Sequence, residues 1–119
     1  MKYNPEKHHR RSIRLKGYDY TRPAHYFVTI CCQDRVRLFG VVKNKKMVLN
    51  DAGKMIHHWY NRLENKFSNV ICHEIVVMPD HVHFIIQLVD PKDQIIPASL
   101  PRIIQWFKTM TTNAYIKGV

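Results

Sequence analysis

The chain has 119 residues, of which 45% are hydrophobic, and a formal net charge of +10 at pH 7. This length and composition suit one compact domain with a core and argue against disorder. No apolar run approaches the roughly 20 residues of a membrane helix, and the first residues lack the apolar stretch of a signal peptide, so we expect a cytoplasmic protein without a membrane partner. The positive charge favours a polyanionic partner, with nucleic acid the first candidate.

The first 22 residues are interpreted as a basic arm, with seven Lys or Arg against two acidic residues. Such an arm can contact phosphates, and interspersed tyrosines can stack on bases. A solvated tail is the alternative that charge by itself leaves open. The candidate DNA contacts in this arm are Arg10, Arg11, Arg14 and Lys16.

Residues 23–119 are interpreted as one domain that begins with strands. Residues 25–32 are aromatic and β-branched, which predicts a buried strand. Residues 36–42 and 46–49 predict a strand pair, and the turn between them places Lys43 and Lys45 as further candidate DNA contacts. Cys31, Cys32 and Cys72 make an odd count, which favours reduced thiols packed as small apolar groups.

A helix is predicted after Asn50 or Asp51, either of which can cap it. Its apolar stripe recurs at helical spacing as far as residue 67. This stripe consists of Ala52, Ile56, Trp59, Leu63 and Phe67.

Residues 70–78 and 81–89 predict two neighbouring strands that are separated only by Pro79 and Asp80. The second strand has an apolar face of Val82, Phe84, Ile86 and Leu88 and a more polar face of His81, His83, Ile85 and Gln87.

A final helix is predicted from Ser99, a suitable N-cap that Pro101 follows in the first turn. Its stripe of Ile103, Ile104, Phe107, Met110 and Ala114 indicates the packed face. The opposite face carries Arg102 and Lys108, which are either solvated or phosphate contacts. The order of elements predicts an α+β fold, an antiparallel sheet with helices on one face.

His81 and His83 are the most informative residues of the chain. Alternate residues of a strand project from one face about 6.5–7 Å apart, so both imidazoles can reach one divalent ion. With eight histidines in 119 residues, such a pair also arises readily by chance, so the pair by itself is weak support. Glu74 on the neighbouring strand is a candidate to orient or supplement the two ligands, whereas Asp80 is expected to serve the turn.

Several blocks of sequence together resemble a known family. They are Tyr26-Phe-Val-Thr-Ile-Cys, Leu38-Phe-Gly, Leu49-Asn-Asp-Ala-Gly, Val77-Met-Pro-Asp-His-Val-His-Phe-Ile and Trp106-Phe-Lys-Thr. They resemble the single-tyrosine HUH transposases of the insertion-sequence-200-like family, and most of all the REP-associated tyrosine transposases. The resemblance runs in order from about Arg10 onward.

The resemblance implies a ferredoxin-like HUH fold and a site where His81 and His83 hold Mg²⁺ or Mn²⁺. It implies that a tyrosine attacks the scissile phosphate of single-stranded or hairpin repeat DNA and forms a 5′-phosphotyrosine link. A third metal ligand would lie one helical turn after that tyrosine. The resemblance also suggests a homodimer.

The chain departs from this pattern at its C-terminal end. The family's nucleophile lies on a helix that would follow Val119, so the chain resembles a C-terminally incomplete or degenerate copy. Tyr115 is the candidate nucleophile within the sequence, but it matches a position in the preceding helix, where packing is the simpler explanation.

Two other function classes stay open. The first is a non-catalytic binder of structured single-stranded DNA, which a metal-dependent covalent adduct would distinguish from the enzyme. The second is an RNA-binding domain that stacks bases on sheet aromatics, but the sequence lacks the characteristic aromatic run of that class.

Overall fold

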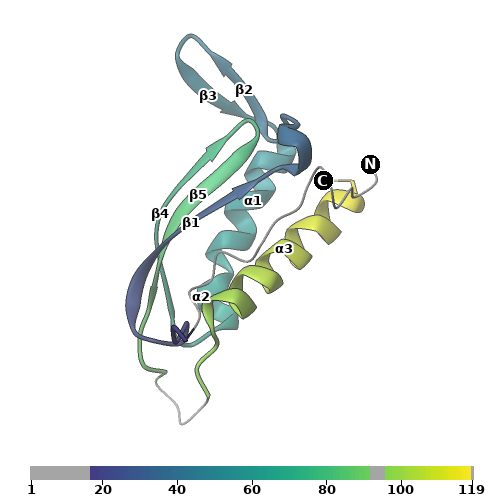
Figure 1. The fold of residues 1–119 in the computed structure, drawn as a ribbon. Helices are drawn as coiled ribbons and strands as arrows, with labels where there is room; N and C mark the ends of the chain where they lie inside the picture. Colours follow the sequence, from purple (N-terminus) through teal and green to yellow (C-terminus); the bar gives the residue numbers. More distant parts are fainter. Residues whose placement is uncertain (1–16, 92–95, 119) are drawn as a thin grey trace.

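A computed structural model of the chain describes residues 17–91 and 96–118 (Figure 1). Its elements confirm the predicted α+β class. In chain order they are β1 (Ala24–Cys31), a 3₁₀ turn η1 (Gln33–Arg35), β2 (Gly40–Lys43), β3 (Lys46–Leu49), α1 (Asp51–Asn61), α2 (Leu63–Lys66), β4 (Val70–Met78), β5 (His81–Leu88) and α3 (Leu100–Ile116).

In the described residues, the main sheet has the antiparallel order β1-β5-β4, so the strand that carries the histidine pair lies in the centre. β2 and β3 pair only with each other and form a hairpin that projects beyond the end of this sheet (Figure 1). The ferredoxin-like arrangement that the resemblance implies stays a prediction, whereas the antiparallel sheet is observed.

The alternation predicted for β5 is confirmed and decides which face of the sheet is covered. Val82, Phe84, Ile86 and Leu88 are all at most 2% exposed. They pack with residues of α1 and α3, and both helices lie on this one face (Figure 1). The other face, which we call the open face, carries His81, His83, Ile85 and Gln87.

Both predicted helix caps are confirmed. The Asn50 side chain accepts a hydrogen bond from the Gly53 N–H at 2.9 Å, and the Ser99 hydroxyl accepts one from the Arg102 N–H at 3.4 Å. These caps satisfy backbone donors that a helix start leaves without an intrahelical partner. They also mark where α1 and α3 begin.

Two predicted element boundaries are wrong. Residues 36–39 are not part of a strand, because the Phe39 N–H donates to Pro79 O at 3.1 Å while Leu38 O and Phe39 O accept from Asn50. The predicted single helix through residue 67 breaks at Arg62, whose N–H donates to Trp59 O and Tyr60 O instead of continuing the helical pattern. At residues 36–39, therefore, tertiary hydrogen bonds override the strand pattern of the local sequence.

The three cysteines are free thiols, as predicted. Cys32 is buried, whereas Cys31 and Cys72 are partly buried. Burial raises the pKa of the Cys72 thiol to about 11. This thiol is therefore protonated at neutral pH and behaves as a small packing group.

Tyr60 ties α1 to the sheet where the ladder is irregular. The register between β4 and β5 shifts between Cys72 and Ile75. The Tyr60 hydroxyl lies 3.0 Å from His73 O and 2.9 Å from Ile85 O, and its ring is 1% exposed. Burial raises the pKa of this phenol.

We therefore expect Tyr60→Phe to lower the free energy of unfolding by about 1–3 kcal/mol, because it removes the hydroxyl that donates to two partly buried carbonyls. Urea denaturation measures the change. The matched control is Tyr115→Phe, whose side chain is 46% exposed, and its effect should stay within about 0.5 kcal/mol. Equal effects of the two substitutions would contradict this assignment.

Candidate metal centre and basic hairpin

His81 and His83 lie together on the open face at the end of β5 that adjoins the Pro79-Asp80 turn. Their ring centroids are 5.3 Å apart. Two imidazoles that bind one ion through bonds of about 2.0–2.1 Å have centroids about 4.5 Å apart at a right angle and about 5.2 Å apart at a tetrahedral angle. The pair therefore has a spacing close to that of two ligands of one ion.

Asp80 orients the first of these rings. His81 Nδ1 lies 2.7 Å from Asp80 Oδ1, and the other carboxylate oxygen accepts a hydrogen bond from Arg35 Nε at 2.9 Å. The hydrogen bond from His81, and then that from Arg35, lower the pKa of the Asp80 carboxyl below its ordinary value. A carboxylate on Nδ1 fixes the tautomer that leaves Nε2 available to a metal ion.

This arrangement corrects the roles expected of the two acidic residues. Asp80 was expected to serve the turn, and its side chain also orients His81 and pairs with Arg35. Glu74 does not lie opposite the pair, because Met78 and Val76 are the β4 residues that face His81 and His83. Across residues 17–91 and 96–118, no three His, Cys, Asp or Glu side chains cluster as metal ligands.

Arg35 is a site residue that the sequence analysis missed. It lies 45 positions from Asp80 along the chain, so no local motif indicates the contact. Asp34 and Arg35 both adopt left-handed backbone conformations, with φ of +55° and +57°. This conformation is uncommon for residues other than glycine, and such residues gather at functional sites.

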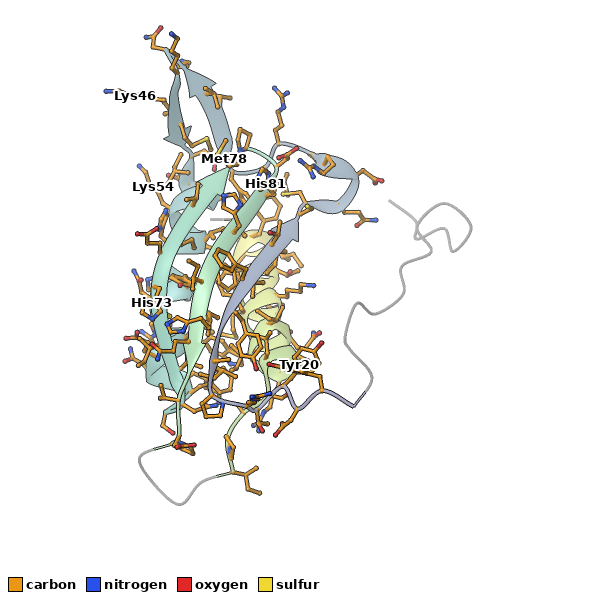
Figure 2. The ribbon with its side chains drawn as sticks, turned by 60° about the vertical axis from the view of Figure 1, so that its left-hand side comes forward. Tyr20, Lys46, Lys54, His73, Met78 and His81 are labelled. Atoms are coloured by element: carbon orange, nitrogen blue, oxygen red, sulfur yellow. The ribbon has the colours of Figure 1, made fainter. Side chains whose placement is uncertain are left out.

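The basic hairpin, β2 and β3 with their connecting turn, is attached at the same end of the sheet. The Phe39 N–H donates to Pro79 O, and the Cys32 N–H donates to Asp80 O at 2.8 Å. In Figure 2, Lys46 lies on the projecting hairpin and His81 lies near its base. Lys43 and Lys45 are exposed at the hairpin tip, so the structure brings these two candidate DNA contacts to the end of the sheet that carries the histidines.

The other candidate DNA contacts lie elsewhere. Arg102 and Lys108 are exposed on α3, on the covered side of the sheet. Arg10, Arg11, Arg14 and Lys16 lie outside the described residues. Residues 17–22 of the predicted arm belong to the folded body.

This attachment of residues 17–22 rests on two tyrosines. The Tyr18 hydroxyl lies 3.2 Å from that of Tyr26, and Tyr20 O accepts from the Leu100 N–H at 2.9 Å. The Tyr18 and Tyr20 rings also contact each other, with centroids 4.8 Å apart.

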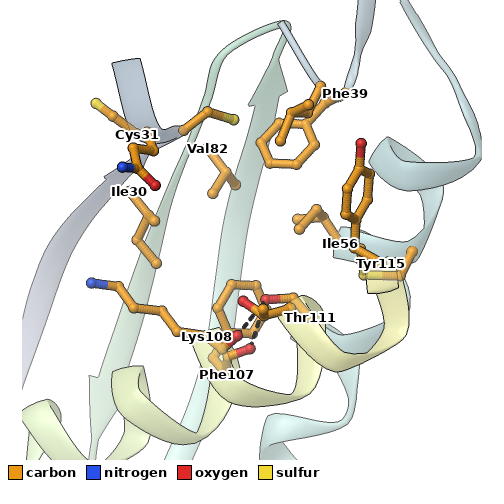
Figure 3. A pocket seen from close by; sticks show the side chains of 14 residues that line it. Ile30, Cys31, Phe39, Ile56, Val82, Phe107, Lys108, Thr111 and Tyr115 are labelled. Atoms are coloured by element: carbon orange, nitrogen blue, oxygen red, sulfur yellow. Dashed lines mark hydrogen bonds between the residues drawn. The ribbon is translucent and has the colours of Figure 1, made fainter. Parts of the chain in front are cut away.

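Tyr115 lines a cavity of about 520 Å³ on the covered side of the sheet (Figure 3). Phe39, Ile56 and Val82 line the same cavity. Because side chains alternate along β5, Val82 projects to the side opposite to His81 and His83. Tyr115 was expected to pack in the core, but it is 46% exposed. It also does not lie beside the histidine pair.

Comparison with known proteins shows that this chain is similar to an uncharacterized protein of Haemophilus influenzae. The two sequences are 44% identical over 89 residues. The match covers 75% of this chain and 49% of the relative, so the chain spans about half the length of the curated relative that it matches. No protein-family model matches the chain, and no solved structure matches it.

In the part of the chain that the structure describes, none of the helices has both the length and the apolar character needed to cross a membrane.

Proposed function

We propose that the chain is the metal-binding and DNA-binding part of a cytoplasmic single-strand DNA endonuclease and strand transferase of the single-tyrosine HUH type, in the REP-associated branch. The observation that carries the proposal is the His81-His83 pair on the open face, with its tautomer set by Asp80 and a basic hairpin at the same end. The choice of family rests on the resemblance of the sequence blocks to the single-tyrosine HUH transposases.

The donor set fits the metal that this family implies. His81 and His83 would hold the ion, and imidazole suits Mn²⁺ better than Mg²⁺, which prefers oxygen ligands. When bound, the ion would polarise a phosphate and neutralise developing charge. Asp80 keeps His81 in the binding tautomer, and Arg35 holds that carboxylate in place.

We propose that the DNA backbone runs beside the basic hairpin. Lys43 and Lys45 would neutralise phosphates, and Arg35, with a side chain 60% exposed, would add a donor next to the metal pair. Arg102 and Lys108 lie on the other side of the sheet, so they would serve a separate contact, such as the second arm of a repeat bound by a homodimer.

We assign no nucleophilic role to Tyr115, because it lies on the covered side of the sheet. The attacking tyrosine would come from outside residues 17–118. The second candidate function, a non-catalytic binder of structured single-stranded DNA, is favoured by the same observation. Both candidates share the metal pair and the basic hairpin.

The test is binding of a fluorescent DNA hairpin with a single-stranded flank, measured by anisotropy over a range of salt concentrations. If each lysine neutralises one phosphate, Lys43→Ala/Lys45→Ala should reduce the slope of log K against log salt by about 1.4, since each contact contributes about 0.7 on a single strand. Lys54→Ala/Lys66→Ala, on α1 and α2, is the control and should change it little. Equal changes in the two variants would refute the hairpin assignment.

The same DNA, incubated with Mn²⁺ and then denatured, tests the role of Tyr115. We expect no covalent adduct with this 119-residue chain. An adduct that Tyr115→Phe abolishes would show that Tyr115 is the nucleophile.

A further inference from the structure

A second pair of imidazoles lies at the other end of the open face. His25 on β1 is opposite Gln87 on β5, and His73 on β4 reaches the same glutamine from the other side. The His25 and His73 ring centroids are 5.2 Å apart. His73 Nε2 and Gln87 Oε1 form a hydrogen bond of 2.9 Å. Three neighbouring strands therefore place three side chains with donor atoms next to one another on the open face.

We propose that His25, His73 and Gln87 form a second divalent-metal site, distinct from the one that His81 and His83 would make. The centroid spacing of 5.2 Å equals the value of about 5.2 Å that two imidazole ligands adopt at a tetrahedral angle and exceeds the value of about 4.5 Å at a right angle. Donor atoms about 2.1 Å from one ion are about 3.0 Å apart when they are neighbours at a right angle. His73 Nε2 and Gln87 Oε1 lie at a similar separation, 2.9 Å, because they are hydrogen-bonded to each other, and a bound ion would replace that hydrogen bond.

The donor set selects the kind of ion. Two imidazole nitrogens and an amide oxygen suit Zn²⁺, Ni²⁺ and Cu²⁺, whereas Mg²⁺ and Ca²⁺ prefer sites made of oxygen. His25 and His73 are both exposed, so water can complete the coordination. β1 and β4 do not pair with each other, because β5 lies between them. An ion held there would connect these two outer strands.

The two sites are far enough apart to act independently. Gln87 lies four residues beyond His83 on β5, which is about 13 Å along a strand. Phe27, with a side chain 85% exposed, is opposite Ile85 in the stretch between them. One ion cannot contact both pairs.

The experiment is calorimetric titration of the full chain with Zn²⁺. His25→Ala and His73→Ala should each weaken one binding event at least about tenfold, because ligand loss costs no less than loss of a residue that supports a ligand. The same binding event should persist in His81→Ala/His83→Ala. Its presence or absence therefore tests the second site independently of the proposed function. His57→Ala, on α1, is the matched control and should leave it unchanged.

Gln87→Glu tests the oxygen ligand by an expected gain in metal affinity, since a carboxylate binds a cation more strongly than an amide does. We expect tighter Zn²⁺ binding in this variant, and a larger rise of melting temperature on adding Zn²⁺. Metal-free melting curves of His25→Ala and His73→Ala should match that of the unchanged chain, because both histidines are exposed. Zn²⁺ affinity that is unchanged by His25→Ala and His73→Ala, or lost only when His81 and His83 are replaced, would overturn the proposal.

Discussion

Replacing both His81 and His83 by alanine is expected to remove Mn²⁺ binding at the Asp80 end of the open face. Each single substitution should weaken it at least about tenfold, because a two-imidazole site loses half of its protein ligands. The metal-free melting temperature should change little, since both side chains project from the face of β5 that does not pack into the core. Calorimetric titration with Mn²⁺, together with a melting curve, measures both quantities.

The matched control for this prediction is His57→Ala/His58→Ala, which removes two adjacent histidines from α1. It should leave Mn²⁺ affinity unchanged, because neither residue lies on β5. Mn²⁺ affinity that survives in both His81→Ala and His83→Ala would eliminate the metal centre and, with it, the observation that carries the proposed function.

Phe107→Ala is expected to lower the free energy of unfolding by about 3–5 kcal/mol. Phe107 is 1% exposed and packs against Phe84 of β5, with ring centroids 5.7 Å apart. It also lines the cavity on the covered side, so truncation enlarges a space that is already there. For a domain with a total stability of about 5–15 kcal/mol, this loss is a large share. Urea denaturation measures it.

Phe27→Ala provides the control, because it removes the same atoms from a ring that is 85% exposed on the open face. Its effect should stay within about 0.5 kcal/mol. A similar loss from both phenylalanines would mean that the open face is packed against something in solution.

The elements that sequence predicted best are those whose signal is local. Alternation of apolar and polar residues in β5 is a property of neighbouring positions, and it correctly separated the buried face from the one that carries His81 and His83. The caps at Asn50 and Ser99 are equally local, because each side chain bonds an N–H three residues ahead. Tyr60 was missed since it lies beside the predicted stripe, and its partners His73 O and Ile85 O are distant in the chain.

By itself, therefore, the sequence determined the α+β class, the strand that carries the histidine pair and the face on which the pair lies. Only the tertiary structure decided what lies near that pair, which is Arg35 on Asp80 and the hairpin base on Pro79, and that Tyr115 lies on the opposite, covered side. It alone also brought His25 and His73 together across β5. The reason is that periodicity and capping act over a few residues, whereas these contacts depend on which strands become neighbours when the core closes.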